Sequence, residues 1–450
     1  MKEKIVILGA GESGTGAALL AKAKGFDVFV SDAGEVKDRY KNDLNSNHIP
    51  FEEGSHADEK ILDAKLLIKS PGIPDKAPIL QKAASLNIPV IDEIEFAFRH
   101  TDAKIIAVTG TNGKTTTTLL AYHLMKHAGY NVGLAGNVGV SMARQVANAN
   151  FDWYVLEISS YQLDGTETFK PEIGILLNIT PDHLDRYDHT MQNYVNSKFQ
   201  LIENMTRQED FIFYQDDEVI TKEMKTRSVV PRQIPVSLKP ESGVAVRFDG
   251  EKMNFDLKEN FAIAQSETTL KGPHNLINTM AAVTAVYQAG VSLDAIRSAL
   301  KTFVNAPHRL ESVGTIHGVE FINDSKATNV DAVVYALDSF DKPLVWIAGG
   351  IDKGNDYGRI AEAVRKKVRA LICLGKDNEK LKRAFGDVVP VMKETQSVKE
   401  LVKIALDLAN KGDVVLLSPA CASFDLFKNY EDRGDQFRSA VKELKNEVAP

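Results

Sequence analysis

A glycine-rich turn in the first third of the chain has the residue types needed to hold a chain of phosphates. An apolar strand runs into Gly110 and Gly113, and Lys114 and Thr115 follow at the start of a helix-forming run. Glycines let backbone N–H groups approach phosphate oxygens, and the helix N-terminus adds partial positive charge. Lys114 can reach the β- and γ-phosphates, and the Thr115 hydroxyl can ligate Mg²⁺. The turn therefore predicts a nucleoside triphosphate site, although Val108 stands where the commonest form of this motif has glycine.

Further polar residues follow the next two predicted strands. An apolar strand ends at Glu157, and a carboxylate in that place commonly holds the metal beside a triphosphate. A second strand, over residues 173–178, precedes His183, which two aspartates flank. This position favours a role in the site over a purely structural histidine. Lys198 lies in a predicted helix over residues 194–203, and spacing alone does not separate it from a solvated lysine.

The N-terminal segment contains a second glycine-rich turn, with glycines at 9, 11 and 14 and Asp32 at the end of the next strand. This arrangement is typical of a Rossmann half, and NAD is its obvious ligand. The strand–helix alternation ends near residue 97, which leaves too little chain for two mononucleotide halves. Another strand ends in a turn at residues 70–73, so a diphosphate other than NAD could lie across the two turns. An exposed carboxylate without a ligand is the alternative for Asp32.

The C-terminal third repeats the alternation of strands and helices. Its predicted strands end in three polar or small-residue runs, at residues 323–329, 349–354 and 418–423. Because ligands bind at the carboxyl edge of open parallel sheets, these runs are expected to form one site.

These patterns predict an α/β protein of three domains, and 450 residues fit that number. The domains are a Rossmann-like domain over 1–97, a P-loop-type ATPase domain over 98–305, and a second Rossmann-like domain over 306–450. Within the central domain, short alternating segments over 210–270 predict an antiparallel flap. Asn275 and Asn278 are spaced to share one face of a following helix.

Composition limits the function classes. A net charge of −7 argues against a polyanion such as nucleic acid as the main partner, and 44% hydrophobic residues suffice for several cores. The two cysteines, Cys373 and Cys421, have no paired metal spacing and indicate a reducing compartment. No signal peptide or membrane span is evident, so a soluble cytoplasmic protein is expected.

Taken together, these segments resemble the Mur ligase family across all three domains. The resemblance rests on motifs shared along the whole chain: Gly9–Gly14, Ser70–Ile73, Thr109–Thr115, Leu156–Ser160, Asn178–Asp185, His274–Asn275, His308–Arg309, Asn323–Asn329 and Ser418–Asn429. The runs at 323–329 and 418–423 are similar to those of the member that adds D-glutamate. The resemblance thus implies an ATP-dependent ligase that joins D-glutamate to UDP-N-acetylmuramoyl-L-alanine through an acyl phosphate, as a cytoplasmic monomer.

The resemblance also implies roles for individual residues. Lys114, His183 and Lys198 would be catalytic. ATP would contact the phosphate loop and residues from two later segments: Gly110, Thr111, Asn112, Gly113, Lys114, Thr115, Thr116, Asn275, Asn278, Arg309, Asp324 and Lys326. The UDP substrate would contact Ser13, Asp32, Ser70, Gly72, Asn137, Gln162 and His183. D-Glutamate would contact Thr328, Lys353, Ser423 and Tyr430, where the family usually has phenylalanine at the last position. Two Mg²⁺ ions would be held by Thr115, Glu157, His183 and a carbamylated Lys198.

Other classes explain less of the chain. A nucleotide-dependent dehydrogenase would account for the first glycine turn but not for the phosphate loop with Glu157. A P-loop switch or interaction protein would account for that loop but not for the N-terminal turns. Folylpolyglutamate synthases share the phosphate loop, but they usually lack a separate Rossmann-like N-terminal domain.

Overall fold

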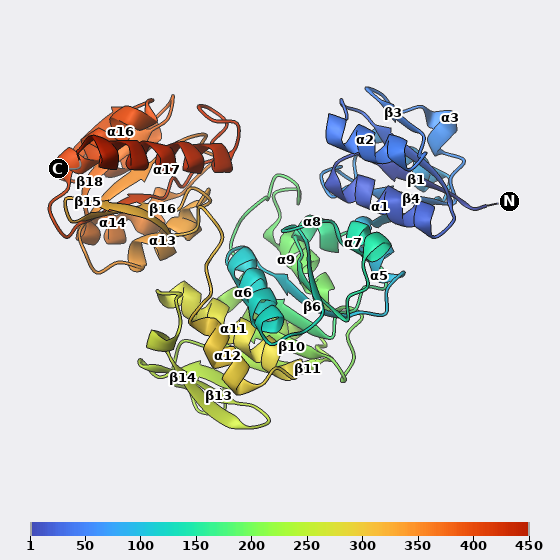
Figure 1. Cartoon of the computed structure of the whole chain (residues 1–450), viewed down its shortest axis with the longest axis horizontal. Coiled ribbons are helices and arrows are strands. Elements are labelled where there is room, and N and C mark those ends of the chain that lie inside the picture. The colour runs from blue at the N-terminus through green and yellow to red at the C-terminus, as the bar shows by residue number, and fades with distance from the viewer. Residues whose placement is uncertain (1, 449–450) are drawn as a thin grey trace. The chain divides into compact units, whose positions relative to one another are not determined.

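The computed structural model of the chain describes residues 2–448 and contains three sheets, each covered by helices (Figure 1). By compactness the chain divides into two units, one of residues 1–269 with 277–303 and one of residues 270–276 with 304–450. Two sheets belong to the first unit and one to the second. The predicted α/β class is confirmed, whereas the domain boundaries at 97 and 305 stay predictions.

The first sheet is a five-stranded parallel sheet of order β3-β2-β1-β4-β5. Strands and helices alternate along it: β1 Lys4–Leu8, α1 Glu12–Ala23, β2 Asp27–Asp32, α2 Asp38–Ser46, β3 Phe51–Glu53, α3 Asp58–Ile61, β4 Leu66–Lys69, α4 Pro78–Ser85, β5 Val90–Asp92 and α5 Glu93–Phe98. β1 pairs with β2 on one side and β4 on the other, so the glycine turn after β1 lies at the centre of the carboxyl edge. Both predicted turns therefore lie at one edge of this sheet.

Small residues let α1 pack closely on its neighbours. The buried positions of α1 are mostly Gly, Ala and Thr, as a short distance between helix axes requires. A Cβ atom at Gly16 would lie 2.0 Å from Ser141 Oγ, so glycine is required where α1 meets α7. The carboxylate of Glu93 accepts hydrogen bonds from Ser141 Oγ at 2.8 Å and from the Ala143 N–H at 2.5 Å. The first and second sheets are thus joined through a fixed contact.

The second sheet has nine strands in the order β14-β13-β12-β11-β10-β9-β6-β8-β7. Its strands are β6 Lys104–Thr109, β7 Val132–Gly136, β8 Trp153–Glu157, β9 Ile173–Leu176, β10 Asp210–Tyr214, β11 Arg232–Ser237, β12 Val246–Phe248, β13 Lys252–Asp256 and β14 Asn260–Ala264. The predicted antiparallel flap is only partly correct. β10, β11 and β12 join the sheet in parallel, and only β13 and β14 pair antiparallel. A helix crosses from β10 to β11, and such a crossover returns the chain in the same direction.

The helices of this region are α6 Lys114–His127, α7 Met142–Asn148, α8 Ser160–Leu163, α9 Met191–Phe199, α10 Glu218–Thr226, α11 Pro273–Gln288 and α12 Leu293–Leu300. The helix predicted over 194–203 begins three residues earlier, and its end is a 3₁₀ turn over Gln200–Ile202. α6 follows β6 through the phosphate loop, as the sequence predicts.

The third sheet has the order β15-β16-β20-β17-β18-β19, parallel except for the β15–β16 pair. Its elements are β15 Glu311–Ile316, β16 Val319–Asn323, α13 Val330–Asp338, β17 Leu344–Ala348, α14 Ala361–Lys367, β18 Val368–Leu374, α15 Glu379–Phe385, β19 Val391–Thr395, α16 Val398–Leu408, β20 Val414–Leu417 and α17 Tyr430–Glu447. Separate cores lie on its two faces, one under α13 and α14 and the other under α16 and α17 (Figure 1). The three polar runs follow β16, β17 and β20, which are adjacent.

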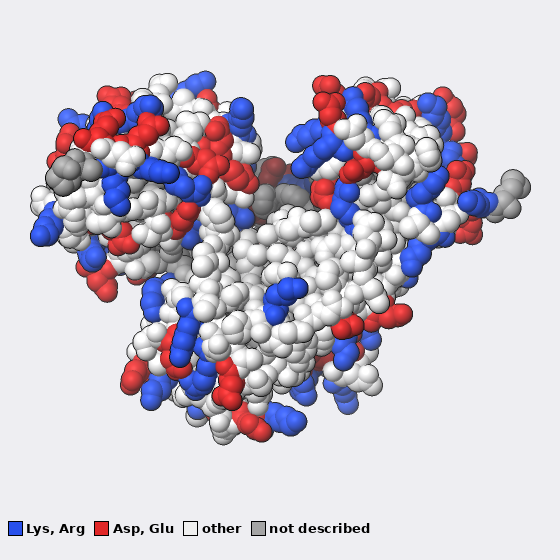
Figure 2. All heavy atoms as spheres, in the orientation of Figure 1, with Lys and Arg blue, Asp and Glu red and all other residues white. Residues whose placement is uncertain are grey.

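Surface charge is mixed. Figure 2 shows basic and acidic side chains interspersed on the face in view, without a continuous basic surface. Within residues 2–448, no helix combines the length and the apolar character needed to span a bilayer.

Glu95 joins α5 to the segment that leads into β9. Its fully buried carboxylate accepts hydrogen bonds from the Thr168 N–H and hydroxyl, from the N–H groups of Glu167 and Phe169, and from Arg99 Nε at 2.7 Å. Burial alone would raise the pKa of Glu95, but these donors outweigh burial and lower it below 4.5. The ionised carboxylate therefore stabilises the folded state.

We expect Glu95→Gln to destabilise the first unit by about 2–4 kcal/mol at pH 7, because a buried set of donors loses its charged acceptor. The stabilisation is complete above the unfolded pKa near 4.5 and is lost as pH falls through the lowered folded pKa. Thermal unfolding at pH 7 and at pH 4 measures both effects. Glu59→Gln, at an exposed position of α3, is the control, and equal midpoints for the two variants at pH 7 would contradict this role.

Candidate functional site

The phosphate loop lies between β6 and α6 and is held from several sides. Gly113 caps α6 with a φ of 85°, and Lys114 is the first residue of the helix. Lys114 Nζ folds back and donates to the carbonyls of Gly110 and Thr111, both at 2.8 Å. The Asn112 N–H donates to Asn178 Oδ1 at 2.8 Å, which ties the loop to the end of β9. The loop therefore has the geometry of an anion-binding turn with a cation across its mouth.

Three of the predicted nucleotide contacts support this loop from within the first unit. Thr115 and Thr116 are buried in the first turn of α6. Asn278 of α11 accepts a hydrogen bond from Thr117 Oγ1 at 3.2 Å, and its Oδ1 lies 2.4 Å from where a Gly113 Cβ would be. Asn278 therefore packs directly on the loop. Asn275 belongs by compactness to the other unit and donates to the Lys271 carbonyl.

Glu157 ends β8 beside the phosphate loop and is 2% exposed. Its Oε1 accepts a hydrogen bond from Asn137 Nδ2 at 2.7 Å, and its carbonyl accepts from the Asn137 N–H at 2.8 Å. Asn137 thus orients the carboxylate. Thr115 and Glu157 together offer hard oxygen donors, which suit Mg²⁺.

Lys198 is buried, with 1% of its side chain exposed, so the alternative of a solvated lysine is wrong. Its Nζ donates to Thr109 Oγ1 at 3.2 Å and to the Gly110 carbonyl at 3.0 Å, and it lies 5.2 Å from the centre of the Tyr194 ring. Burial, followed by the nearby Lys114 charge, lowers the pKa of Lys198 well below its ordinary value. Burial therefore favours the unprotonated form of this amine.

His183 lies in the turn after β9 and is half exposed, with a φ of 54°. Its ring is 5.2 Å from that of Tyr161, and Arg186 stacks on the same tyrosine at 4.1 Å. Arg186 also donates to the carbonyls of Gly72 and Ile73, at 3.4 and 3.1 Å. No spacing in the sequence indicates that Arg186 joins the turn after β9 to the turn after β4. Among residues 2–448 no three His, Cys, Asp or Glu side chains form a metal cluster, so a cation here needs other oxygens as well.

A cavity of about 660 Å³ opens at the carboxyl edge of the first sheet. Three of the predicted substrate contacts, Asp32, Ser70 and Gly72, line it, and Ser13 is the second residue of the adjacent α1. The Asp32 carboxylate already accepts from the N–H groups of Ala10 and Gly34, at 2.6 and 2.8 Å. Asp32 therefore shapes the two turns that border the cavity.

Gln162, another predicted substrate contact, is 2% exposed and belongs to the N-terminal cap of α8. Its Oε1 accepts from the Ser159 N–H at 3.0 Å, while the Ser159 side chain accepts from the Gln162 N–H. The structure therefore gives this side chain a capping role.

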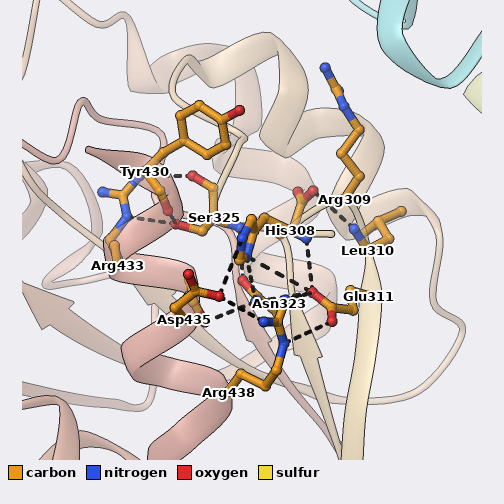
Figure 3. Close-up of polar contacts among 12 residues, drawn as sticks. His308, Arg309, Leu310, Glu311, Asn323, Ser325, Tyr430, Arg433, Asp435 and Arg438 are labelled. Carbon is orange, nitrogen blue, oxygen red and sulfur yellow. Dashed lines mark hydrogen bonds and ion pairs between the residues drawn. The ribbon is translucent and has the colours of Figure 1, made fainter. Parts of the chain in front are cut away.

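In the second unit, a buried arginine draws the polar runs together. Arg433 of α17 is 1% exposed and donates to Ser325 Oγ at 2.9 Å, to the Cys421 carbonyl at 3.2 Å and to the Gly349 carbonyl at 3.4 Å. Each acceptor follows a different one of the three central strands. Figure 3 shows Arg433 beside Ser325, whose hydroxyl donates to the Tyr430 carbonyl. No spacing in the sequence singled out Arg433, because burial of an arginine cannot be read from its neighbours.

The predicted D-glutamate contacts lie on these runs or at the start of α17. Ser423 is buried, Thr328 and Tyr430 are half-buried, and Lys353 is exposed. Lys326 Nζ lies 5.4 Å from the centre of the Tyr430 ring. These residues provide a cation, hydroxyls and an aromatic face at one edge of the sheet.

Arg309 and Asp324 adjoin the same edge. The Asp324 carboxylate accepts from the Leu310 N–H at 3.2 Å and from Ser418 Oγ at 3.0 Å, and burial raises its pKa to about 7. His308 points into a cluster with Asn323, whereas the Arg309 side chain points away from it (Figure 3).

Family models match three successive segments of the chain. The N-terminal domain of Mur ligases of the MurD-like type matches residues 3–92, the Mur ligase middle domain matches residues 108–286, and the Mur ligase glutamate ligase domain matches residues 308–421.

Close relatives match the chain from end to end. A UDP-N-acetylmuramoylalanine–D-glutamate ligase of Cytophaga hutchinsonii is 52% identical over 99% of this chain and 100% of that protein. One of Bacteroides fragilis is 50% identical over 98% of this chain and 100% of that protein.

Solved structures show the same fold at low identity. The UDP-N-acetylmuramate–alanine ligase of Thermotoga maritima aligns with a TM-score of 0.62 at 18% identity, over 99% of this chain and 100% of that one. A pseudomurein peptide ligase of Methanothermus fervidus aligns with a TM-score of 0.63 at 19% identity, over 98% of this chain and 100% of that one.

We expect Gly113→Ala to weaken ATP binding at least about tenfold, because its Cβ would displace Asn278 and the loop has a left-handed φ there. Gly129→Ala is a matched control: it has the same φ of 85° but no atom within 4 Å of the added Cβ. Both variants place alanine at a left-handed φ and so have the same conformational strain. A difference in ATP affinity, measured by calorimetric titration with ATP and Mg²⁺, therefore reports the displacement of Asn278 from the loop. Equal affinities in the two variants would contradict the phosphate-binding role.

Proposed function

The chain belongs to the Mur ligase family, and from that premise we propose that it joins D-glutamate to UDP-N-acetylmuramoyl-L-alanine with ATP, in peptidoglycan precursor synthesis. The observation that carries this proposal is the full-length match, at about half identity, to relatives with that activity. One chain contains the phosphate loop, the cavity at the first sheet and the polar edge of the third sheet, so we expect the protein to act as a monomer. Because the reaction consumes ATP, we expect it to take place in the cytoplasm.

The chemistry requires activation of a carboxylate. The carboxylate of the UDP-linked substrate attacks the γ-phosphorus of ATP, the bond to the β-phosphate oxygen breaks, and ADP leaves. The D-glutamate amine then attacks the acyl phosphate carbon, forms the amide, loses a proton and expels phosphate. Since all the reacting groups before the amine are anions, the protein must supply positive charge at the transferred phosphoryl group.

Lys114 supplies such a charge from the first residue of α6. The loop N–H groups hold the phosphate chain in line, and Asn278 keeps the loop in place through its contact with Thr117. For Mg²⁺, we propose Thr115 and Glu157 as ligands, since both are buried oxygen donors at this loop. When bound, Mg²⁺ neutralises charge on the phosphates.

We further propose that Lys198 is carbamylated and, with His183, helps to hold a second Mg²⁺. An ammonium group cannot ligate a cation, whereas a carbamate offers two oxygens. Carbamylation needs a neutral amine to attack CO₂, forming an N–C bond and losing a proton. The burial that lowers the pKa of Lys198 favours this neutral form.

At the third sheet, we propose that Lys353, Thr328, Ser423 and Tyr430 bind D-glutamate. Arg433 supports this assignment, because it fixes the segments after β16, β17 and β20 relative to one another. Contacts from three rigid strand ends can distinguish the two enantiomers of an amino acid.

D-Glutamate should be used at least about 100-fold better than L-glutamate, because the wrong enantiomer leaves a charged group unpaired. Phosphate release with UDP-N-acetylmuramoyl-L-alanine and ATP is measured with D-glutamate, L-glutamate, L-lysine, meso-diaminopimelate or glycine in parallel. Equal or faster use of L-lysine or diaminopimelate would assign the chain to another branch of the family. Lys353→Ala should raise the KM for D-glutamate more than that for ATP.

Lys198→Ala should remove most of the activity, and added bicarbonate should restore none of it. Lys222→Ala, at an exposed position of α10, should change the rate by less than about twofold. Both are measured as phosphate release at saturating substrates, with bicarbonate present and absent. An active Lys198→Ala protein would refute the carbamate.

A further inference from the structure

His56 lines the cavity of the first sheet from the connection between β3 and α3. Its Nδ1 lies 2.7 Å from Ser31 Oγ, and Ser31 Oγ lies 2.7 Å from Glu52 Oε1. Ser31 is fully buried at the end of β2. Among the described residues, Nε2 on the other side of the ring has no hydrogen-bond partner. His56 is therefore held at one ring nitrogen and open at the other.

The hydrogen-bond chain fixes which ring nitrogen has the proton. Burial would raise the pKa of Glu52, but hydrogen bonds from Ala57, Ser31 and Lys60 outweigh it and lower the pKa below its ordinary value. Glu52 is thus ionised at neutral pH and can only accept. Because a serine hydroxyl has one proton, Ser31 donates it to Glu52 and must accept from Nδ1–H of His56. In the tautomer that has its single ring proton on Nδ1, Nε2 is an acceptor.

The lining of the cavity combines apolar side chains with polar and backbone groups, which is the mixture that a nucleoside requires. One part is apolar and is formed by the turn after β4 and the start of α4: Ile73, Pro74, Ala77, Pro78 and Ile79. Gly9 and Gly11 also line the cavity, at the N-terminus of the twelve-residue α1, and a Cβ added at Gly9 would lie 3.6 Å from Ile73 Cδ1. In a Rossmann-type half the diphosphate lies at that helix and the nucleoside extends past the end of the second strand. The base is then placed on the His56 side.

We propose that Nε2 of His56 accepts the N3–H of the uracil base of the substrate, which makes His56 a residue that determines base specificity. Uracil has a donor at N3, whereas cytosine has a lone pair there that would face the lone pair of Nε2. The nearby Lys82, paired with Asp58, can donate to a base carbonyl. This inference rests on the proposed function and names the group that recognises one part of its substrate.

The test compares UDP with CDP as probes on the full chain. Calorimetric titrations are made at pH 7.5 with the phosphate loop saturated by ADP and Mg²⁺, so that the probes report the first-sheet cavity. Wild type should bind UDP at least about 30-fold more tightly than CDP, because the lone pair of Nε2 would face the N3 lone pair of cytosine with no proton between them. His56→Ala should reduce this ratio below about threefold, mainly by weakening UDP.

Two further variants test the mechanism and guard against loss of fold. His56→Gln keeps an acceptor oxygen and should retain part of the UDP/CDP affinity ratio. Ser31→Ala should lower this ratio, because without the Ser31 hydroxyl the ring proton of His56 can lie on either nitrogen. His48→Asn is the control, because His48 is exposed, and asparagine tolerates its left-handed φ of 52°. It should keep the wild-type ratio and the wild-type Tm.

An unchanged UDP/CDP ratio in His56→Ala would overturn the proposal, as would a wild-type ratio near one. Turnover keeps this outcome distinct from failure of the proposed function. If wild type releases no phosphate with UDP-N-acetylmuramoyl-L-alanine and D-glutamate, the proposed function fails, whereas the binding ratio still decides the role of His56.

Discussion

Two lysine side chains meet at one backbone carbonyl. Lys114 Nζ and Lys198 Nζ both donate to the Gly110 oxygen, at 2.8 and 3.0 Å, at the point where β6 ends and the phosphate loop begins. Burial, followed by the charge of Lys114, lowers the pKa of Lys198, which favours loss of the proton from the buried amine. One lysine thus remains a cation for the phosphates, while the other becomes a neutral amine. The proposed division of roles between a charge-bearing and a carbamylated lysine rests on this difference in burial and on the proximity of both side chains to the Gly110 carbonyl.

The functional residues lie just beyond strand ends because backbone polar groups there are not paired within the sheet. Backbone groups within a parallel sheet are paired, whereas those just beyond each strand are available to bind or to hold side chains. The protein fixes these ends with polar side chains: Asn178 at the phosphate loop, Asp32 at the first glycine turn and the buried Arg433 at the third sheet. Each of them bonds to backbone groups of a turn. The turns can therefore be precise although they are not part of regular structure.

Much of this arrangement could be predicted from the sequence. Glycine turns after apolar strands located the phosphate loop and the first-sheet cavity, because the physical requirement for glycine there is local. The buried state of Lys198 could not be predicted, since it depends on packing between α9 and β6. The hydrogen bonds that Gln162 and Asp32 make to backbone groups of neighbouring turns could not be predicted either, while their roles as substrate contacts stay predictions. The antiparallel flap over 210–270 was predicted correctly only in part, because strand alternation does not specify strand direction.

The hydrogen-bond chain formed by Glu52, Ser31 and His56 could not be predicted from the sequence, because it depends on distances between side chains of two neighbouring strands and a loop. Each residue alone is ordinary, and only the 2.7 Å spacing on both sides of Ser31 Oγ turns three polar groups into a directional chain. A carboxylate fixes the serine proton, the serine fixes the histidine proton, and the histidine then has one defined acceptor. The direction of such a chain follows from counting protons, because one hydroxyl can donate only once. Recognition at the cavity is therefore set by a carboxylate that does not line it.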